Sequence, residues 1–247
     1  MIEGRVKGKR AYNSQRRQAQ AAATRAAILE AAQKLFERDG YVATTMDAVA
    51  AEAGVSLKTV YLAFTTKSGL LRAVWDLLLK GDLDDAPIAD RPMYREMLEE
   101  QDPAKQLRMN AHNARITKSR IAAILRVIRS AAVLDADAAS LWDLIQSDFY
   151  DNQRVLVAAI HAHGGLRREL DVDRATDILW TLNHPDVWLL LSGERSWTPE
   201  QFEEWFAGIT CDQLLAPEAP GSRPTGVSST WTPLVKVTNS RPHGHRP

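Results

Sequence analysis

Hydrogen-bond donors are concentrated in the short segment Ser56-Leu57-Lys58-Thr59-Val60-Tyr61. Hydroxyl and ammonium groups of this kind donate to the edges of nucleic-acid bases and to phosphate oxygens, and a phenol can donate to a phosphate. Recognition of a nucleic acid is therefore the chemistry that these residue types favour.

Two short helices are expected to hold this segment in place. The first runs from Met46 to Ala53 behind the cap Thr44–Thr45, and the second runs from Leu57 to Ala63 behind the cap Ser56. Between them, Gly54 supplies the positive φ angle that a tight turn between crossing helices requires. Such a turn presents the second helix, N-terminus first, to a DNA major groove. The side chains expected on its outer face or edge are Ser56, Leu57, Lys58, Thr59, Tyr61 and Leu62.

Longer helices are expected on both sides of this pair. One runs from about Ala19 to a stop at Gly40, and the other begins near Lys67. Thr45 and Lys67 therefore lie at the starts of helices, where backbone N–H groups and the positive end of the helix dipole favour a phosphate.

A set of residues between Arg25 and Trp75 keeps a fixed order and spacing without a gap. Its members are Ile28, Leu29, Ala31, Ala32, Leu35, Phe36, Gly40, Tyr41, Thr44, Thr45, Ala50, Ala53, Gly54, Val55, Ser56, Thr59, Val60, Tyr61, Phe64, Lys67, Leu70 and Leu71. In this order the segment resembles the N-terminal domain of TetR-type transcriptional regulators.

The resemblance implies an all-α homodimer. Three N-terminal helices would bind DNA, and a fourth would lead to a larger domain that dimerises and binds a small effector, which changes the separation of the two DNA-reading heads. The resemblance also implies that the DNA contacts come from Thr45, Lys58, Thr59, Tyr61 and Lys67.

The chain departs from the family pattern in one place. Two polar or aromatic residues commonly separate the tyrosine from the phenylalanine, whereas here these positions hold Leu62 and Ala63. Leu62 can still contact a thymine methyl group.

The remainder of the chain has helical patterns and no strand pattern. Helices are expected at Met93–Glu100, Pro103–Lys118, Ile121–Leu134 and Ala136–His163, from Asp171–Asp173 through Trp180 to an interruption at Pro185, and after the capping box Thr198-Pro199-Glu200-Gln201. We therefore expect an all-α fold with four parts. These are a flexible basic arm (1–18), a helix-turn-helix DNA-binding domain (19–66), a helical effector-binding and dimerisation domain (67–216) and a disordered tail (217–247).

Aromatic and polar side chains of the larger domain are candidates for lining an effector cavity. The chain has 7 tryptophans, which is an unusual number, although each aromatic residue taken singly also fits a core position and each polar one a surface position. The candidates are Met109, His112, Arg115, Trp142, Phe149, Tyr150, Trp180 and Asn183. A cavity with apolar walls and few polar groups suits an apolar or aromatic effector.

Charge is unevenly distributed along the chain. The formal net charge is zero, yet residues 1–80 carry 13 Lys or Arg against 7 Asp or Glu. A basic N-terminal part indicates a polyanionic partner for that part alone. Its basic arm could follow the DNA backbone or the minor groove, or remain a solvated tail. The arm residues in question are Arg5, Lys7, Lys9, Arg10, Arg16 and Arg17.

Other classes of protein fit the sequence poorly. The single cysteine, Cys211, cannot form an internal disulfide, which favours the cytoplasm, and no apolar run reaches the roughly 18 residues of a membrane span. Pairs such as His161 and His163 do not place both imidazoles on one helix face, so we expect no metal site. We find no nucleophile motif, phosphate loop or paired carboxylates, so we expect no cofactor and no enzymatic activity.

The favoured function is a sequence-specific, DNA-binding transcriptional regulator. We expect a homodimeric repressor that a small apolar effector releases from a near-palindromic operator. A non-specific or architectural DNA-binding protein is the main alternative, and a helical enzyme or binding protein with a vestigial DNA-binding head is a remote one.

Overall fold

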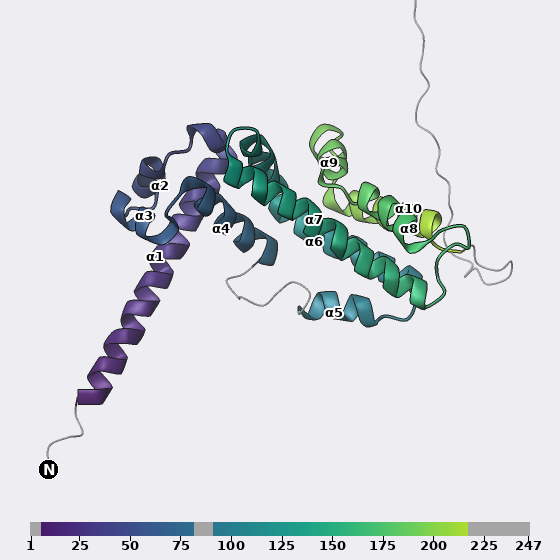
Figure 1. Ribbon diagram of the computed structural model, residues 1–247, viewed down its shortest axis with the longest axis horizontal. Helices are drawn as coiled ribbons and strands as arrows, with labels where there is room; N and C mark the ends of the chain where they lie inside the picture. Colours follow the sequence, from purple (N-terminus) through teal and green to yellow (C-terminus); the bar gives the residue numbers. More distant parts are fainter. Residues whose placement is uncertain (1–5, 82–90, 217–247) are drawn as a thin grey trace, which may run out of the picture. The chain divides into compact units, whose positions relative to one another are not determined.

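The computed structural model describes residues 6–81 and 91–216 of the chain. The described part is helical, and within it the only β-type pairing is an isolated antiparallel bridge between Leu166 and Leu215. The elements, labelled in Figure 1, are α1 (Val6–Ala43), α2 (Met46–Glu52), α3 (Leu57–Phe64), α4 (Lys67–Lys80), α5 (Pro92–Glu99), α6 (Pro103–Ala132), α7 (Ala136–Ala162), α8 (Val172–Leu182), α9 (Pro185–Trp188), the π-helix η2 (Leu189–Glu194) and α10 (Pro199–Leu214). The prediction of an all-α fold is confirmed.

The two longest helices of the larger domain, α6 and α7, lie side by side and connect two apolar cores (Figure 1). One core joins α1 to α4 with the C-terminal half of α6 and the start of α7, and includes Phe36, Leu71 and Ile128. The other joins α5, α8 and α10 with the opposite halves of the pair, and includes Phe202 and Phe206. The helix-turn-helix and the C-terminal helices are therefore packed onto the same pair of helices.

Capping residues set most helix starts where the sequence predicts them. Thr45, Ser56 and Thr66 each accept a hydrogen bond from a backbone N–H of the first turn that they cap. At the start of α10, Thr198 and Gln201 form the predicted capping box. Pro185 interrupts the chain between α8 and α9, as expected, but the π-helix that follows has no counterpart in the prediction.

Two helix boundaries were predicted wrongly. The first helix begins at Val6, so the backbone of residues 6–18 is helical rather than an irregular arm. The Ala, Gln and Arg residues there are good helix formers, although they lack the apolar periodicity that marked the predicted start. Gly40 nonetheless interrupts the first helix as expected, with a φ of 78°.

The second error concerns α6, which is one helix from Pro103 to Ala132 instead of two that meet near Lys118. No glycine or proline lies at the predicted break, and the Ser119 hydroxyl donates to the Arg115 carbonyl 2.8 Å away, one turn back. Lys118, at the predicted break, lies within the continuous helix and is only 4% exposed.

The predicted tail, 217–247, and the arm residue Arg5 lie outside the described residues. Arg16 and Arg17 are exposed on α1.

Candidate nucleic-acid interface and its link to a cavity

The turn between α2 and α3 has the geometry that its sequence predicts. Gly54 adopts a φ of 66°, in the left-handed region that favours glycine. Ser56 then caps α3, accepting from the Thr59 N–H at 3.2 Å, and the two hydroxyls lie 2.7 Å apart. Val49 and Val60 are fully buried and pack α2 and α3 into the first core. The orientation of α3 is therefore fixed by both a cap and a core.

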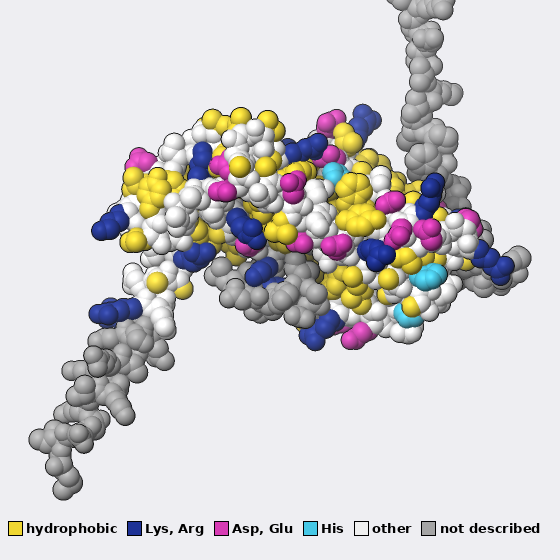
Figure 2. Space-filling model, viewed as in Figure 1, with side chains coloured by type: hydrophobic (Ala, Val, Ile, Leu, Met, Phe, Trp, Pro, Cys, Tyr) yellow, Lys and Arg dark blue, Asp and Glu magenta, His cyan; other side chains and the backbone are white. Residues whose placement is uncertain are grey.

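The outer face of α3 combines a basic side chain with apolar and phenolic ones. Lys58 is exposed, as are Tyr61 and Leu62, with 48% and 78% of their surface accessible. Leu57 is 37% exposed, whereas Thr59 is partly covered because it pairs with Ser56. Over α3, Figure 2 shows hydrophobic side chains next to a basic one. This face offers an ammonium, a phenol and apolar contact area to a groove.

Thr45 and Lys67, the two residues predicted to flank the recognition helix, differ in how their side chains are placed. Thr45 is exposed, and its hydroxyl accepts from the Ala48 N–H at 3.1 Å, so it lies at the start of α2 as expected. The Lys67 ammonium instead turns back on the protein, donating to the Tyr41 carbonyl at 2.9 Å and lying 4.2 Å from the centre of the Tyr41 ring. Lys67 thus ties the start of α4 to Tyr41, and its predicted contact with DNA stays a prediction.

Arg25 was not identified from the sequence as a site residue. Its guanidinium donates to the Ala63 carbonyl at 3.2 Å and lies 4.2 Å from the centre of the Phe64 ring, so it covers the C-terminal end of α3. A cation is favourable there because of the helix dipole. The contact joins residues 38 positions apart, and no local pattern marks such a pair.

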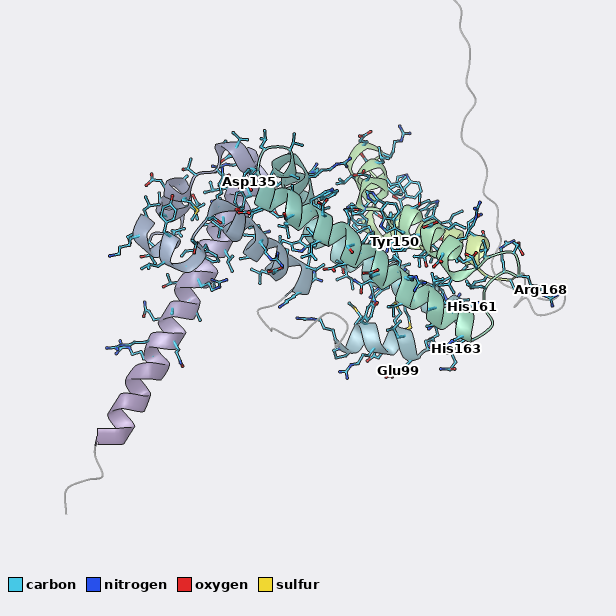
Figure 3. All side chains as sticks on the ribbon, in the orientation of Figure 1. Glu99, Asp135, Tyr150, His161, His163 and Arg168 are labelled. Atoms are coloured by element: carbon cyan, nitrogen blue, oxygen red, sulfur yellow. The ribbon has the colours of Figure 1, made fainter. Side chains whose placement is uncertain are left out.

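A chain of polar contacts joins the helix-turn-helix to α7. The Tyr41 hydroxyl donates to Asp135 Oδ2 at 2.6 Å, and Asp135 Oδ1 accepts from the Asp137 and Ala138 N–H groups at the start of α7. Ser68, on α4, donates to Asp137 at 3.0 Å. The hydrogen bond from Tyr41 helps to hold the pKa of Asp135 below its usual value. In Figure 3, Asp135 lies at the end of α7 next to the N-terminal helices.

A cavity of about 590 Å³ lies between α4, α5, α6 and α7. Its size is within the usual range for small-molecule sites. Apolar walls come from residues that include Trp75, Met97, Ile121, Leu141 and Phe149. Since α4 contributes to this cavity and follows directly on the helix-turn-helix, a ligand there would lie against the helix that carries the DNA-reading head.

Of the eight predicted effector-binding residues, Phe149 and Asn183 line this cavity. The other six lie outside its lining. Arg115 forms an ion pair with Glu203 on α10, and His112 Nδ1 lies 3.1 Å from the same carboxylate. Met109 packs against the second core.

The remaining three predicted residues are aromatic. Trp142 lies beside the Arg129 guanidinium, 5.8 Å from it, and Tyr150 donates to Asp177 at 3.1 Å. Trp180 packs edge-on between Tyr150 and His184. Figure 3 labels Tyr150, which lies along α7 near α8. The sequence indicated aromatic residues but could not decide which helix faces the cavity.

Lys118 lines the cavity and was not predicted to do so. Its ammonium donates to Asn183 Oδ1, and Asn183 Nδ2 donates in turn to Gln153 Oε1 at 3.2 Å. Burial lowers the pKa of Lys118 to about 7. A signal for this position existed, because Ala111, Ala114, Lys118, Ile121 and Leu125 follow helical spacing along one buried stripe.

Comparison with known proteins identifies the N-terminal part. Residues 28–74 match the sequence model of the bacterial regulatory proteins of the tetR family, and this range coincides with the core of α1 through α4. The chain carries a TetR-type helix-turn-helix domain. One curated relative, the uncharacterized HTH-type transcriptional regulator YhgD of Bacillus subtilis (strain 168), is 49% identical over 53 residues. That match spans 22% of this chain and 28% of YhgD.

Solved structures share the fold well beyond this domain. A SmeT–triclosan complex aligns with a TM-score of 0.63 at 20% identity, over 83% of this chain and 99% of SmeT. NalD of Pseudomonas aeruginosa, described as the secondary repressor of the MexAB-OprM multidrug efflux pump, aligns with a TM-score of 0.61 at 20% identity, over 80% and 98%. A transcriptional regulator of Saccharomonospora viridis in complex with choline aligns with a TM-score of 0.62 at 17% identity, over 78% and 98%. The TetR-type fold therefore includes the cavity-bearing helices.

Two further features of the described residues bear on other classes of site. Within the described ranges, no three His, Cys, Asp or Glu residues gather closely enough to hold a metal ion, and His161 and His163 lie together at the far end of α7 (Figure 3). Among the same residues, no helix combines the length and the apolar character that a membrane crossing requires.

Proposed function

We propose that the chain is a sequence-specific transcriptional repressor that binds a near-palindromic operator as a homodimer and leaves it when a small molecule occupies the cavity. The observation that carries the proposal is the outer face of α3, where Lys58, Tyr61 and Leu62 project from a helix that a cap and a buried core hold rigidly. Such a face suits base edges, phosphates and thymine methyl groups in a major groove. As a regulator of transcription, the protein would act in the cytoplasm.

Homodimer formation would use α8 and α10. Ile178 and Leu182 of α8, together with Ile209 of α10, line a shallow groove of about 400 Å³ on the surface, with polar residues such as Arg174 and Gln213 among the other residues that line it. A second copy placed over this groove would cover the apolar residues. Two-fold symmetry would then set the half-sites roughly one or more helical turns, about 34 Å each, apart on DNA.

Effector release would act through α4. Occupation of the cavity changes the contacts of Trp75 and Leu79, which lie on the helix that follows the helix-turn-helix. A ligand that binds better to one position of α4 shifts the population toward it, and operator affinity falls if the reading heads no longer match the half-sites. The relatives crystallised with triclosan and choline support a small-molecule role for this fold.

Selection of binding sites from a random duplex library, at about 0.15 M salt, tests the proposal. We expect enrichment of a near-palindrome whose half-sites fit the two-fold symmetry of a dimer. The control is a Lys58→Ala, Tyr61→Phe double variant, which removes the polar groups from the outer face of α3. Both side chains are exposed and neither is part of the core, so the substitutions alter this face and not the fold.

A non-specific DNA-binding protein is the second candidate. It is favoured by the exposed Leu62, which takes a position commonly polar or aromatic in the family, and by the exposed Arg16 and Arg17 on α1. Binding that enriches no sequence and disappears as salt rises would favour this candidate over the first.

A further inference from the structure

We propose that the effector is an amphipathic organic acid, whose carboxylate is bound by Lys118 inside the cavity. The inference rests on the proposed function of the cavity as an effector site and names the chemical class of that effector. It adds a carboxylate to the apolar or aromatic effector that the sequence led us to expect.

Lys118 is placed to meet a ligand in an apolar surrounding. It lines the cavity, and its ammonium lies 5.5 Å from the centre of the Phe149 ring and 5.6 Å from that of Phe202. The single hydrogen bond recorded for it goes to the neutral amide oxygen of Asn183. Two of the three ammonium protons therefore lack an acceptor among the residues that the structure describes.

Among the described residues, no carboxylate forms an ion pair with Lys118, and burial is the sole recorded cause of its lowered pKa. A buried charge without a counter-charge is costly, and in proteins such a group is usually paired with a group of opposite charge. Asn183 cannot supply the charge, since its amide is neutral and is itself held by Gln153. A ligand carboxylate would supply both the missing acceptors and the missing charge.

A second unsatisfied donor faces the same ligand space. Asn110, 7% exposed, lines the cavity, and its Nδ2 is buried without a hydrogen-bond partner in the structure. It lies eight positions before Lys118 on α6, which is about 12 Å along the helix axis. A ligand that reaches both residues would carry its carboxylate at Lys118 and a hydrogen-bond acceptor toward Asn110.

The apolar part of the lining defines the rest of the ligand. Leu125, Ile145 and Phe149 line the same cavity as Lys118. The part of the ligand beyond its carboxylate should therefore be apolar.

Anion binding should be coupled to a proton. Because the Lys118 pKa is about 7, a bound carboxylate would favour the ammonium form and the complex would take up a proton at slightly alkaline pH. The titratable neighbour in the α8–α9 connection is His184, whose pKa is already lowered, chiefly by burial and slightly by Lys118. The other charged groups among the described residues of the lining are Arg72, Asp76 and Lys80 on α4, Arg91 before α5, Arg120 on α6 and Asp148 on α7.

The test compares carboxylic acids with their own primary amides, which keep the shape and remove the charge. Suitable probes are biphenyl-4-carboxylate, naphthalene-2-carboxylate and decanoate, each titrated calorimetrically at pH 7 beside its amide. The variants are Lys118→Met, which keeps an unbranched side chain one atom shorter and removes the charge, and Lys105→Met. The second is a control on the same helix, whose side chain is 58% exposed and paired with Glu100.

We expect at least one carboxylate to bind the wild type tenfold or more tightly than its amide. Lys118→Met should abolish this preference, and Lys105→Met should retain it. In the wild type, the preference should also shrink between pH 7 and pH 9 as Lys118 loses its proton, and this measurement does not depend on the folding of any variant.

The inference is overturned if none of the carboxylates is preferred to its amide, or if the preference survives in Lys118→Met. DNA binding is measured separately, on the duplex library. Carboxylate preference without DNA binding would overturn the proposed function and leave the acid site standing. Sequence-specific DNA binding without carboxylate preference would overturn the acid site and leave the proposed function standing.

Discussion

Tyr41 and Asp135 are joined by a hydrogen bond of 2.6 Å between the tyrosine hydroxyl and the carboxylate. The two residues are 94 positions apart; one follows the kink at Gly40, and the other caps α7. Tyr41 also contacts Lys67 through its ring and its carbonyl. This pair therefore fastens the helix-turn-helix to a helix that lines the cavity.

Replacing Tyr41 with Phe removes this hydrogen bond and leaves the ring in place. Since the acceptor is charged and the tyrosine is only 6% exposed, we expect the free energy of unfolding to fall by about 1.5–3 kcal/mol. Urea denaturation followed by circular dichroism measures the change. Tyr61→Phe is the control, because its hydroxyl has no recorded partner among the described residues and its removal should leave stability unchanged.

Lys58→Ala should weaken DNA recognition without affecting the fold. The side chain is exposed and makes no recorded contact within the protein, so the free energy of unfolding should not change. Binding to the selected operator should weaken by about 1–3 kcal/mol if the ammonium contacts a base. Lys58 could contact a base or a phosphate, and fluorescence anisotropy on the operator and on a scrambled duplex separates these two roles. An equal loss of affinity for both duplexes would mean that Lys58 contacts phosphate alone.

Gly54→Ala tests whether the turn depends on backbone conformation alone. A Cβ at this position would meet no atom within 4 Å, but φ is +66°. We therefore expect a modest destabilisation of about 1–2 kcal/mol, from the cost of the left-handed conformation. Gly193→Ala is the matched control because it has the same open surroundings without a positive φ, and a similar loss there would show that the cost arises elsewhere.

Stability should rise with pH above neutrality because of Lys118. Its pKa is about 7 in the folded protein, below the 10.5 of a free lysine, so the unfolded chain binds more protons between these values. The free energy of unfolding therefore increases with pH across this window, by up to about 1.4 kcal/mol per pH unit, and the stabilisation is lost as pH falls toward 7.

Thermal melts from pH 7 to pH 9.5 measure this effect. The upper limit avoids Tyr41, whose pKa is raised mainly by burial and whose ionisation would oppose the trend. Lys118→Met should flatten the profile, whereas Lys105→Met should keep it. An unchanged slope in Lys118→Met would mean that another group causes the dependence.

The helix-turn-helix could be predicted closely because its signals are local. Ser56 caps its own helix, Gly54 makes its own turn, and Val49 and Val60 follow helical spacing into the core. Each of these features depends on residues a few positions apart, and the sequence displays them directly.

The cavity could not be predicted to the same degree, because it depends on how distant helices pack. Arg115 and Lys118 are both basic and lie one turn apart on α6, yet Arg115 pairs with Glu203 while Lys118 enters the cavity. Which of the two faces inward is decided by α7 and α10, far along the chain. The same holds for Tyr41, whose partner Asp135 belongs to another helix.

The central claim is that α3 reads a specific DNA sequence in a dimer. The most direct measurement is the ratio of dissociation constants for the selected duplex and for a scrambled duplex of equal length, at about 0.15 M salt, with the stoichiometry from sedimentation. The account predicts a ratio of about 1,000 or more and two chains for each duplex. A ratio near one, with an affinity that falls equally for both duplexes as salt rises, would contradict it.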